Sequence, residues 1–264
     1  MYTFKYKRAA SVIEAEKAFK AGEDAVFLAG GQTLIPTLKQ RLAGPSDVID
    51  IKHLKDLQEL TTCDGAVIIG AGICHADVAA SAEVQKSIPA LSYLAQCIGD
   101  PQVRNCGTLG GSVANNDPAS DYPAALLGLG ATVYTSKREI AADDFFIGMF
   151  ETKLDPGELI VKVSFPIPKR AAYAKFPNPA SRYAVVGVMV AETNSGIRVA
   201  VVGAGPVVFR LPEMEAALSK SFTAEAINNI PISAKDLNED LHATAGYRAH
   251  LVGVMAQRAV GSIT

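Results

Sequence analysis

Two glycine-rich segments contain the residues that are best suited, by type and spacing, to bind an anionic ligand. The longer segment runs from Cys106 to Asp121 and reads CGTLGGSVANNDPASD. Within six of its positions it holds three glycines and two hydroxyl residues, namely Gly107, Thr108, Gly110, Gly111 and Ser112. Because glycine has no Cβ and tolerates a positive φ, such a segment can bring backbone N–H groups close to an anion. The two hydroxyls can each donate one more hydrogen bond to a phosphate oxygen.

Asp121 ends this segment, and its side chain disfavours an anion. A carboxylate repels a phosphate, but it accepts hydrogen bonds from sugar or polyol hydroxyls. A segment with donors at one end and an acceptor at the other is typical of a cradle for a nucleotide cofactor. The alternative is that a polar, glycine-rich stretch is only a turn between two elements.

A second segment of the same kind, LAGGQTLI, spans Leu28 to Ile35. It follows the apolar run Val26–Leu28 and leads into the helical pattern Leu34–Leu42. Two such segments in one domain could hold the two phosphates of a diphosphate, which favours the cofactor interpretation over the turn. Neither segment is a standard fingerprint, since the chain has no GxxxxGK[ST] run and no GxGxxG after an N-terminal strand. A diphosphate site must therefore rest on another scaffold.

The composition excludes several other classes of protein. With 264 residues, 49% apolar and 20% charged, the chain can form two or three packed units. Its net charge of -2 offers no basic surface for nucleic acid. The N-terminus lacks the apolar core of a signal peptide, and the longest apolar run, Ala184–Ala191, is too short to span a bilayer. We therefore expect a cytoplasmic protein with no membrane span and no nucleic-acid partner.

Neither the cysteines nor the histidines are spaced as metal ligands. The cysteines, Cys63, Cys74, Cys97 and Cys106, contain no CxxC pair, which argues against a zinc site or an iron–sulfur cluster within this chain. Free thiols in a reducing cytoplasm are the favoured interpretation. No nucleophile, base and orienting group of the hydrolase kind can be picked out, so we assign no catalytic residue. Arg104 could pair with a phosphate or form an ordinary surface salt bridge.

The elements that would position the two segments fall into three regions. Residues 1–51 predict a small βαβ unit, and residues 52–168 predict a larger α+β unit. Residues 169–264 predict a C-terminal domain with three antiparallel strands, Ala171–Phe176, Tyr183–Glu192 and Ile197–Val202. Three helical patterns follow the strands, at Pro212–Leu218, Ala224–Asn229 and Leu241–Val260. The predicted fold class is therefore α+β, with domains at 1–168 and 169–264.

The two segments, followed by a strand hairpin and helices, resemble the FAD-binding subunit of the molybdenum hydroxylases. That family includes the medium subunit of aerobic carbon monoxide dehydrogenase and the flavin domain of xanthine dehydrogenase. The most specific part of the resemblance is Thr108–Asn115 followed by Pro118–Asp121, and the resemblance covers essentially the whole chain. It implies that residues 1–168 form a two-part FAD-binding domain and that residues 169–264 form a C-terminal flavoprotein domain.

The resemblance also implies a set of cofactor-binding residues. They are Ala29, Gly30, Gly31, Gln32, Thr33, Thr108, Gly110, Gly111, Ser112, Asn115, Asp121, Ile160 and Lys175. The two glycine-rich segments would hold the FAD diphosphate, and Asp121 would accept hydrogen bonds from the ribityl chain or a ribose. Ile160 would present its backbone to the isoalloxazine ring, and Lys175 would lie near that ring. Ile98 matches a position near the adenine, and Tyr183 would either border the flavin or be a core residue.

Two departures from the family pattern affect the cofactor. Gln32 stands where many relatives have His or Asn, so no histidyl–flavin link can form there. Cys106 precedes the second segment rather than lying within its phosphate-binding part, so we expect FAD to be bound noncovalently. No insertion with extra cysteines is visible, and we therefore expect no four-iron cluster.

The function that the resemblance implies is electron transfer. A partner chain would oxidise the substrate at a molybdopterin centre, and an iron–sulfur partner would relay electrons through [2Fe-2S] clusters. The FAD of this chain would pass them to a small-molecule acceptor, which could be NAD, a quinone, a cytochrome or oxygen. Two alternatives remain: a stand-alone FAD-dependent oxidoreductase, or a non-enzymatic nucleotide-binding assembly module. The stand-alone enzyme would need an acid or base beside the flavin, for which the sequence offers no candidate. The substrate of the complex and the oligomeric state of the chain stay open.

Overall fold

The first fifty residues form a small parallel sheet covered by two helices, as the apolar runs predict. In the computed structural model, which describes residues 1–263, the strand order is β1–β3–β2. The elements are β1 (Lys5–Arg8), α1 (Val12–Ala21), β2 (Ala25–Leu28), α2 (Leu34–Lys39) and β3 (Asp47–Asp50). Helix α1 is capped by Ser11, whose hydroxyl accepts a hydrogen bond from the Glu14 N–H at 3.1 Å, while the Glu14 carboxylate accepts from the Ala10 N–H at 3.0 Å. Strand β1 is absent from the prediction because all four of its residues are exposed and carry no apolar pattern.

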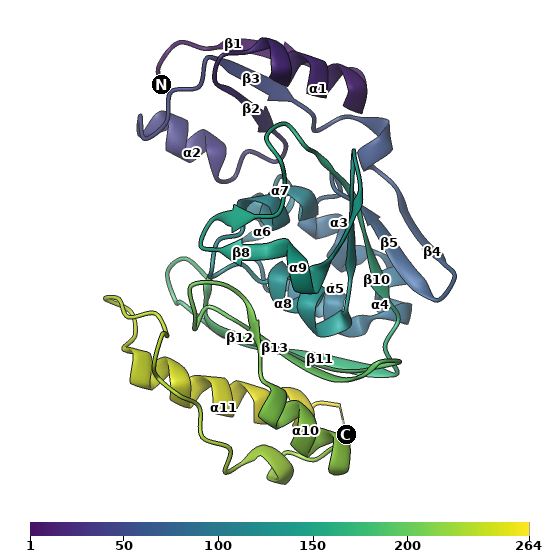
Figure 1. Cartoon of the computed structure of the whole chain (residues 1–264), viewed down its shortest axis with the longest axis vertical. Coiled ribbons are helices and arrows are strands. Elements are labelled where there is room, and N and C mark those ends of the chain that lie inside the picture. Colours follow the sequence, from purple (N-terminus) through teal and green to yellow (C-terminus); the bar gives the residue numbers. More distant parts are fainter. Residues whose placement is uncertain (264) are drawn as a thin grey trace.

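The middle unit is built on a five-stranded antiparallel sheet in the order β4–β5–β10–β6–β7 (Figure 1). Its strands are β4 (Leu60–Cys63), β5 (Ala66–Gly70), β6 (Thr132–Thr135), β7 (Glu139–Ala141) and β10 (Ile160–Pro166). A separate hairpin pairs β8 (Phe146–Gly148) with β9 (Glu151–Thr152). The helical segments are η1 (Lys55–Leu57), α3 (His75–Ala80), α4 (Ala82–Ser87), α5 (Pro89–Gln96), α6 (Pro101–Arg104), α7 (Leu109–Asn115), α8 (Tyr122–Leu129) and α9 (Ala142–Phe145). Every residue of α8 is buried, so this helix lies in the centre of the molecule.

The C-terminal sheet has four antiparallel strands, which corrects the predicted three. The order is β11 (Arg170–Pro177), β12 (Ala184–Thr193), β13 (Gly196–Val202) and β14 (Phe209–Arg210). Strand β14 is only two residues long, too short to produce an alternating pattern. The helices that follow are α10 (Pro212–Lys220) and α11 (Ala245–Gly261). The helix predicted over Ala224–Asn229 is a single 3₁₀ turn, η2 (Glu225–Ile227), and Pro231 follows shortly after it.

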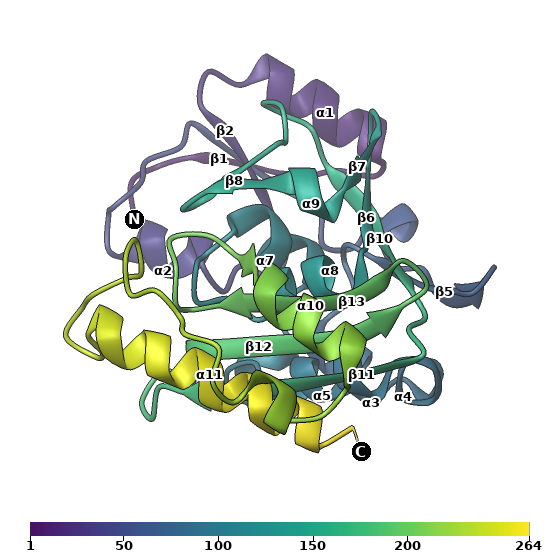
Figure 2. The same ribbon diagram turned by 60° about the horizontal axis from the view of Figure 1, so that its bottom comes forward.

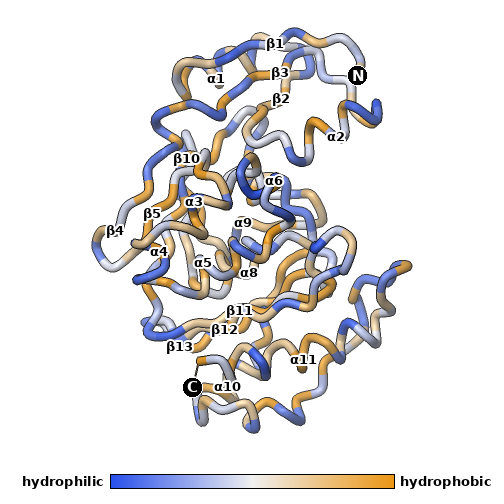
Figure 3. The backbone as a smooth tube through the Cα atoms, turned by 180° about the vertical axis from the view of Figure 1, so that it is seen from behind, coloured by the Kyte–Doolittle hydropathy of each residue, from blue (hydrophilic) through white to orange (hydrophobic). Residues whose placement is uncertain are grey.

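This sheet is covered on both faces, which explains why β12 carries apolar residues on both faces from Ala184 to Ala191, apart from Gly187. Met189 and Ala191 join the core that contains α8, whereas Val188 and Val190 face the core formed with α10 and α11. Figure 2 shows α10 and α11 lying across the outer face of β11, β12 and β13. The hydropathy colouring of Figure 3 shows the same stack from behind, with the two helices below the sheet.

The end of the longer glycine-rich segment is held by backbone hydrogen bonds to this sheet. The Gly203 N–H donates to the Pro118 carbonyl at 2.7 Å, and the Ala184 N–H donates to the Ala119 carbonyl at 3.3 Å. These bonds fix the approach to Asp121 between the middle unit and the C-terminal sheet. Within residues 1–263 no helix is long and apolar enough to cross a membrane.

Candidate cofactor-binding site

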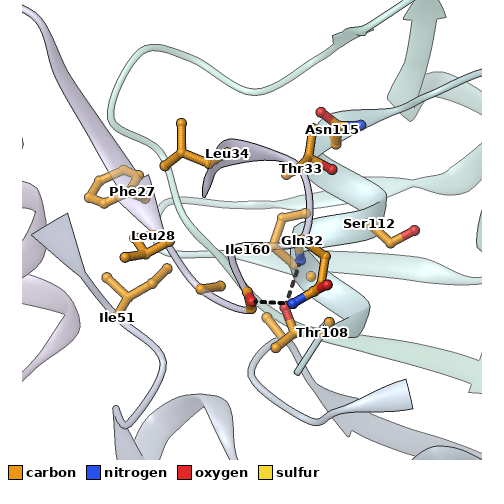
Figure 4. Close-up of a pocket in the computed structure, with 18 of the residues that line it drawn as sticks. Phe27, Leu28, Gln32, Thr33, Leu34, Ile51, Thr108, Ser112, Asn115 and Ile160 are labelled. Carbon is orange, nitrogen blue, oxygen red and sulfur yellow. Dashed lines mark hydrogen bonds between the residues drawn. The ribbon is translucent and has the colours of Figure 1, made fainter. Parts of the chain in front are cut away.

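Both glycine-rich segments line one cavity of about 790 Å³. This volume lies within the range of about 300–1,000 Å³ that is usual for small-molecule and cofactor sites. The N-terminal unit contributes residues 25–34, the middle unit contributes parts of 98–121 and of 152–160, and the C-terminal region contributes Ser181, Arg182 and Tyr183. Figure 4 shows side chains of both segments around the cavity, with Ile160 beside them. Residues far apart in the sequence are thus brought to one site.

The first segment presents a row of unpaired backbone donors to this cavity. Gly31 has a φ of +71°, a left-handed conformation that suits glycine. In the described part of the chain, no acceptor is bonded to the backbone N–H groups of residues 30–34. Consecutive free N–H groups beside a left-handed residue form a concave site for an anion. The first segment therefore offers the free donors that an anion site requires.

The second segment differs from its predicted geometry, because its first part is a helix rather than a loop. Helix α7 begins at Leu109, and the Thr108 hydroxyl caps it by accepting a hydrogen bond from the Gly111 N–H at 3.1 Å. The Gly110 N–H donates to the Ala71 carbonyl at 2.8 Å. The amides of both glycines are therefore bonded within the protein in this structure, and their placement beside a phosphate stays a prediction. Gly110 instead allows close packing, since a Cβ there would overlap the side chain of Ala71.

Side chains on α7 supply the polar groups that this segment offers to the cavity. Ser112 and Asn115 are half-buried, line the cavity and form no side-chain hydrogen bond within residues 1–263. Thr33 of the first segment is exposed and its hydroxyl is likewise unbonded. Of the cavity-lining residues in the described chain, Arg182 is the sole lysine or arginine. A bound diphosphate would therefore depend on neutral donors rather than on a cation.

Asp121 lies at the start of α8 and is 3% exposed. The Tyr173 hydroxyl donates to its Oδ1 at 2.5 Å, and Lys175 Nζ lies 2.9 Å from the carboxylate. Lys175 also donates to the Cys97 carbonyl at 3.0 Å. Burial raises the pKa of Asp121, and the Lys175 charge and the Tyr173 hydrogen bond oppose that rise. Asp121 lines the cavity, whereas Lys175 is buried behind it and reaches the cavity only through Asp121.

Tyr173 is a residue of this site that sequence reasoning missed. It is buried and hydrogen-bonds the one carboxylate singled out from the sequence. A signal was available: Tyr173 and Lys175 are two residues apart on β11, and residues at that spacing lie on the same face of a strand. Once Lys175 was assigned to the site, Tyr173 could have been assigned with it.

His75 is a second missed residue. It lines the cavity, is 4% exposed, and its Nδ1 has no hydrogen-bond partner within the described residues. Burial, with a smaller contribution from the Arg104 charge, lowers the pKa of His75 to about 4, so the ring is neutral near pH 7. The position of the His75 ring also explains why residue 107 is a glycine, because a Cβ there would lie 2.7 Å from His75 Nε2.

The remaining residues named from the sequence lie as follows. Ile98 and Ile160 line the cavity, Ile160 at a register shift in the β10–β6 pairing. Tyr183 also lines it and is 46% exposed, so it is not a core residue. The Arg104 guanidinium donates to the Ile98 and Gly99 carbonyls and shapes the turn before α6, and within the described residues it forms no salt bridge. Within residues 1–263 no group of three or more His, Cys, Asp or Glu is arranged to hold a metal.

Comparison with known proteins identifies the family to which this chain belongs. Residues 2–168 match the family model for the FAD binding domain in molybdopterin dehydrogenase, and residues 171–263 match the CO dehydrogenase flavoprotein C-terminal domain. The chain belongs to the FAD-binding medium subunits of the molybdenum hydroxylases. As a member of that family, it is an oxidoreductase subunit of the carbon monoxide and glyceraldehyde dehydrogenase type.

Relatives of this family are similar to the chain over nearly its whole length. The carbon monoxide dehydrogenase medium chain of Hydrogenophaga pseudoflava is 33% identical, covering 98% of this chain and 96% of its own. The glyceraldehyde dehydrogenase medium chain of Sulfolobus acidocaldarius is 34% identical, with 97% and 96% covered. A solved carbon monoxide dehydrogenase from H. pseudoflava, which lacks the Mo-pyranopterin moiety of its molybdenum cofactor, superposes with a TM-score of 0.89 at 34% identity over 98% of this chain and 96% of that one.

Proposed function

We propose that this medium subunit carries noncovalent FAD and transfers electrons within a molybdenum hydroxylase complex. It takes electrons from a [2Fe-2S] partner and passes them to an external small-molecule acceptor. The observation that carries the proposal is the shared cavity, which has free backbone donors at residues 30–34 and a buried carboxylate at Asp121. An elongated dinucleotide such as FAD requires both of these features, donors for its diphosphate and an acceptor for its polyol hydroxyls.

The residues present fit FAD in the following way. The free amides of residues 30–33, with Ala29 beside them, would hold the diphosphate, and the unbonded hydroxyl of Ser112 would add a donor from α7. Asp121 accepts from a ribityl or ribose hydroxyl. Ile160 and Ile98 both line the cavity, where the Ile160 backbone would border the isoalloxazine and Ile98 would lie near the adenine. FAD, when bound, supplies the redox chemistry; the chain binds it, orients it and shields it from water.

Among the described residues that line the cavity, we assign none to substrate oxidation. Neutral His75 is the one imidazole among the described residues that line the cavity, and it is buried against Gly107. Substrate oxidation is therefore assigned to a molybdopterin chain and electron relay to an iron–sulfur chain. We also propose the division of this chain into domains 1–168 and 169–264, with 1–51 and 52–168 as the parts of the first.

Purification of the chain with and without its genomic neighbours tests this function. The chain alone should bind FAD and show the visible spectrum of a flavin, but it should oxidise no purine, aldehyde or carbon monoxide. Co-expression with a molybdopterin chain and an iron–sulfur chain should give one complex with substrate-dependent flavin reduction. Substrate oxidation by this chain alone, without molybdenum or iron, would overturn the proposal.

A further inference from the structure

The Asp121 carboxylate is held in place by the C-terminal domain rather than by its own. Its contacts to side chains come from Tyr173 and Lys175, both on β11, and the carboxylate and the Lys175 ammonium are each 4% exposed. A buried carboxylate without partners is costly, so these two groups offset part of that cost and hold the carboxylate in one orientation. Through Asp121, two side chains of β11 that do not themselves line the cavity act on its wall.

The sheet contains a feature that makes room for this arrangement. Gly187 on β12 pairs with Lys175 on β11, and a Cβ on Gly187 would overlap the Tyr173 hydroxyl. A side chain at position 187 would therefore displace the hydroxyl from Asp121. The glycine interrupts an otherwise continuous apolar strand, and glycine in a strand weakens it unless a close approach requires it.

We propose that Tyr173 is a positioning residue for FAD, which it orients through the Asp121 carboxylate. Each carboxylate oxygen can accept more than one hydrogen bond, so Asp121 can bind a cofactor hydroxyl while Tyr173 and Lys175 hold it from behind. Tyr173 itself does not line the cavity in the described structure and acts only through Asp121. The inference rests on the proposed FAD-binding function.

The groups around Asp121 give this role a pH signature. Lys175 is the cation beside Asp121, and its charge lowers the pKa of the carboxylate. The Asp121 charge in turn raises the pKa of three neighbouring groups, the Cys97 thiol and the Tyr122 and Tyr183 phenols. The Tyr173 hydrogen bond lowers the pKa of Asp121 against the effect of burial. If the ionised carboxylate binds the cofactor, FAD affinity falls as the pH drops through that pKa, and loss of the Tyr173 hydroxyl moves this fall to higher pH.

Tyr173→Phe removes the hydroxyl and keeps the ring. Tyr122→Phe is the matched control, because Tyr122 is equally buried, adjoins Asp121 in the sequence, and its hydroxyl has no partner within the described residues. The measurement is the affinity of the deflavinated full chain for FAD, detected by the quenching of flavin fluorescence. It is made between pH 5 and pH 8, roughly the range of ordinary protein stability. Tyr173→Phe should weaken FAD binding about tenfold, the effect of losing one hydrogen bond to a charged group, and should shift the acid limb upward. Tyr122→Phe should change neither.

A double-mutant cycle separates positioning from a structural role. In the Asp121→Asn background, Tyr173→Phe should cost little further affinity, because its route to FAD is already lost. An equal loss in both backgrounds, or wild-type affinity and pH profile in Tyr173→Phe, would overturn the inference. If Tyr173→Phe does not fold, Gly187→Ala displaces the same hydroxyl and must produce the same upward shift; an unshifted profile in that variant counts against the inference. A wild-type chain that binds no FAD overturns the proposed function instead.

Discussion

Gly30 lies so close to the backbone of Cys106 that no side chain fits between them. A Cβ built on Gly30 would overlap the Cys106 carbonyl oxygen and lie 2.6 Å from the Gly107 Cα. The two glycine-rich segments, which begin about eighty residues apart in the sequence, are therefore in backbone contact at one wall of the cavity. This contact makes the pair a single site.

Replacement of Gly30 by alanine should separate the two segments. The added methyl group meets backbone atoms, which cannot move aside as a flexible side chain can, so Gly30→Ala should cost about 1–3 kcal/mol of unfolding free energy. It should also lose most of the bound FAD. Gly246→Ala is the control, since a Cβ there meets nothing within 4 Å. Flavin content per chain and denaturant unfolding measure both effects; full flavin content in Gly30→Ala would contradict this account of the contact.

His75 should make the protein less stable in acid. Its pKa in the folded chain is lowered to about 4, whereas the unfolded chain takes up the proton near pH 6.5. Between these values the unfolded state binds more protons, so stability falls as the pH falls. This one group should remove about 2–3 kcal/mol between pH 7 and pH 4.5.

The His75→Gln variant should lose that part of the pH dependence. Urea unfolding of wild type and variant at pH 7 and pH 4.5 gives the difference directly. His250→Gln serves as the control, because His250 lies exposed on α11. Equal pH dependence in wild type and His75→Gln would show that His75 is protonated in the folded chain.

FAD should leave the denatured protein in free form. Gln32 carries no nucleophilic nitrogen of the histidine kind, and Cys106 precedes α7 rather than standing within it. Acid precipitation should therefore release the yellow colour into the supernatant. Colour that stays in the pellet after washing would indicate a covalent link.

The tip of the β8–β9 hairpin should contribute to partner binding. Ile147, Met149 and Phe150 are each more than half exposed there. The buried Asn116 amide holds this tip through the Gly148 and Glu151 carbonyls at 2.8 and 2.9 Å, and Phe150 has a left-handed φ of +56°. An exposed apolar tip that is held by hydrogen bonds is typical of an interaction surface.

Phe150→Asn tests this surface without strain, since asparagine adopts the left-handed conformation more readily than phenylalanine. It should weaken association with the partner chains about tenfold or more, as for a buried aromatic at an interface, and leave FAD content unchanged. Ile13→Asn on α1 is the control, because Ile13 is 78% exposed and lies outside the hairpin. Co-purification of tagged chains measures the effect; equal partner recovery in both variants would exclude the hairpin tip from the interface.

The sequence alone determined the local elements and the family. Apolar periodicity predicted α8 at Tyr122–Leu129 and the strands of the C-terminal sheet, because these elements bury whole faces and must carry apolar residues there. The motif from Thr108 to Asp121 was sufficient for the resemblance that the family models bear out. Elements with no buried pattern, such as the exposed β1 and the two-residue β14, left no periodic signal.

Only the tertiary structure decided what each polar group of the site does. Whether an amide is free depends on which carbonyl the fold brings near it: Ala71 takes the Gly110 N–H, while the amides of residues 30–34 meet no acceptor in the described chain. Tyr173 meets Asp121 because the fold brings a residue of β11 within hydrogen-bond distance of the start of α8, a contact across 52 positions. Hydrogen-bond pairing of this kind is a property of distance in space, and spacing along the chain does not encode it.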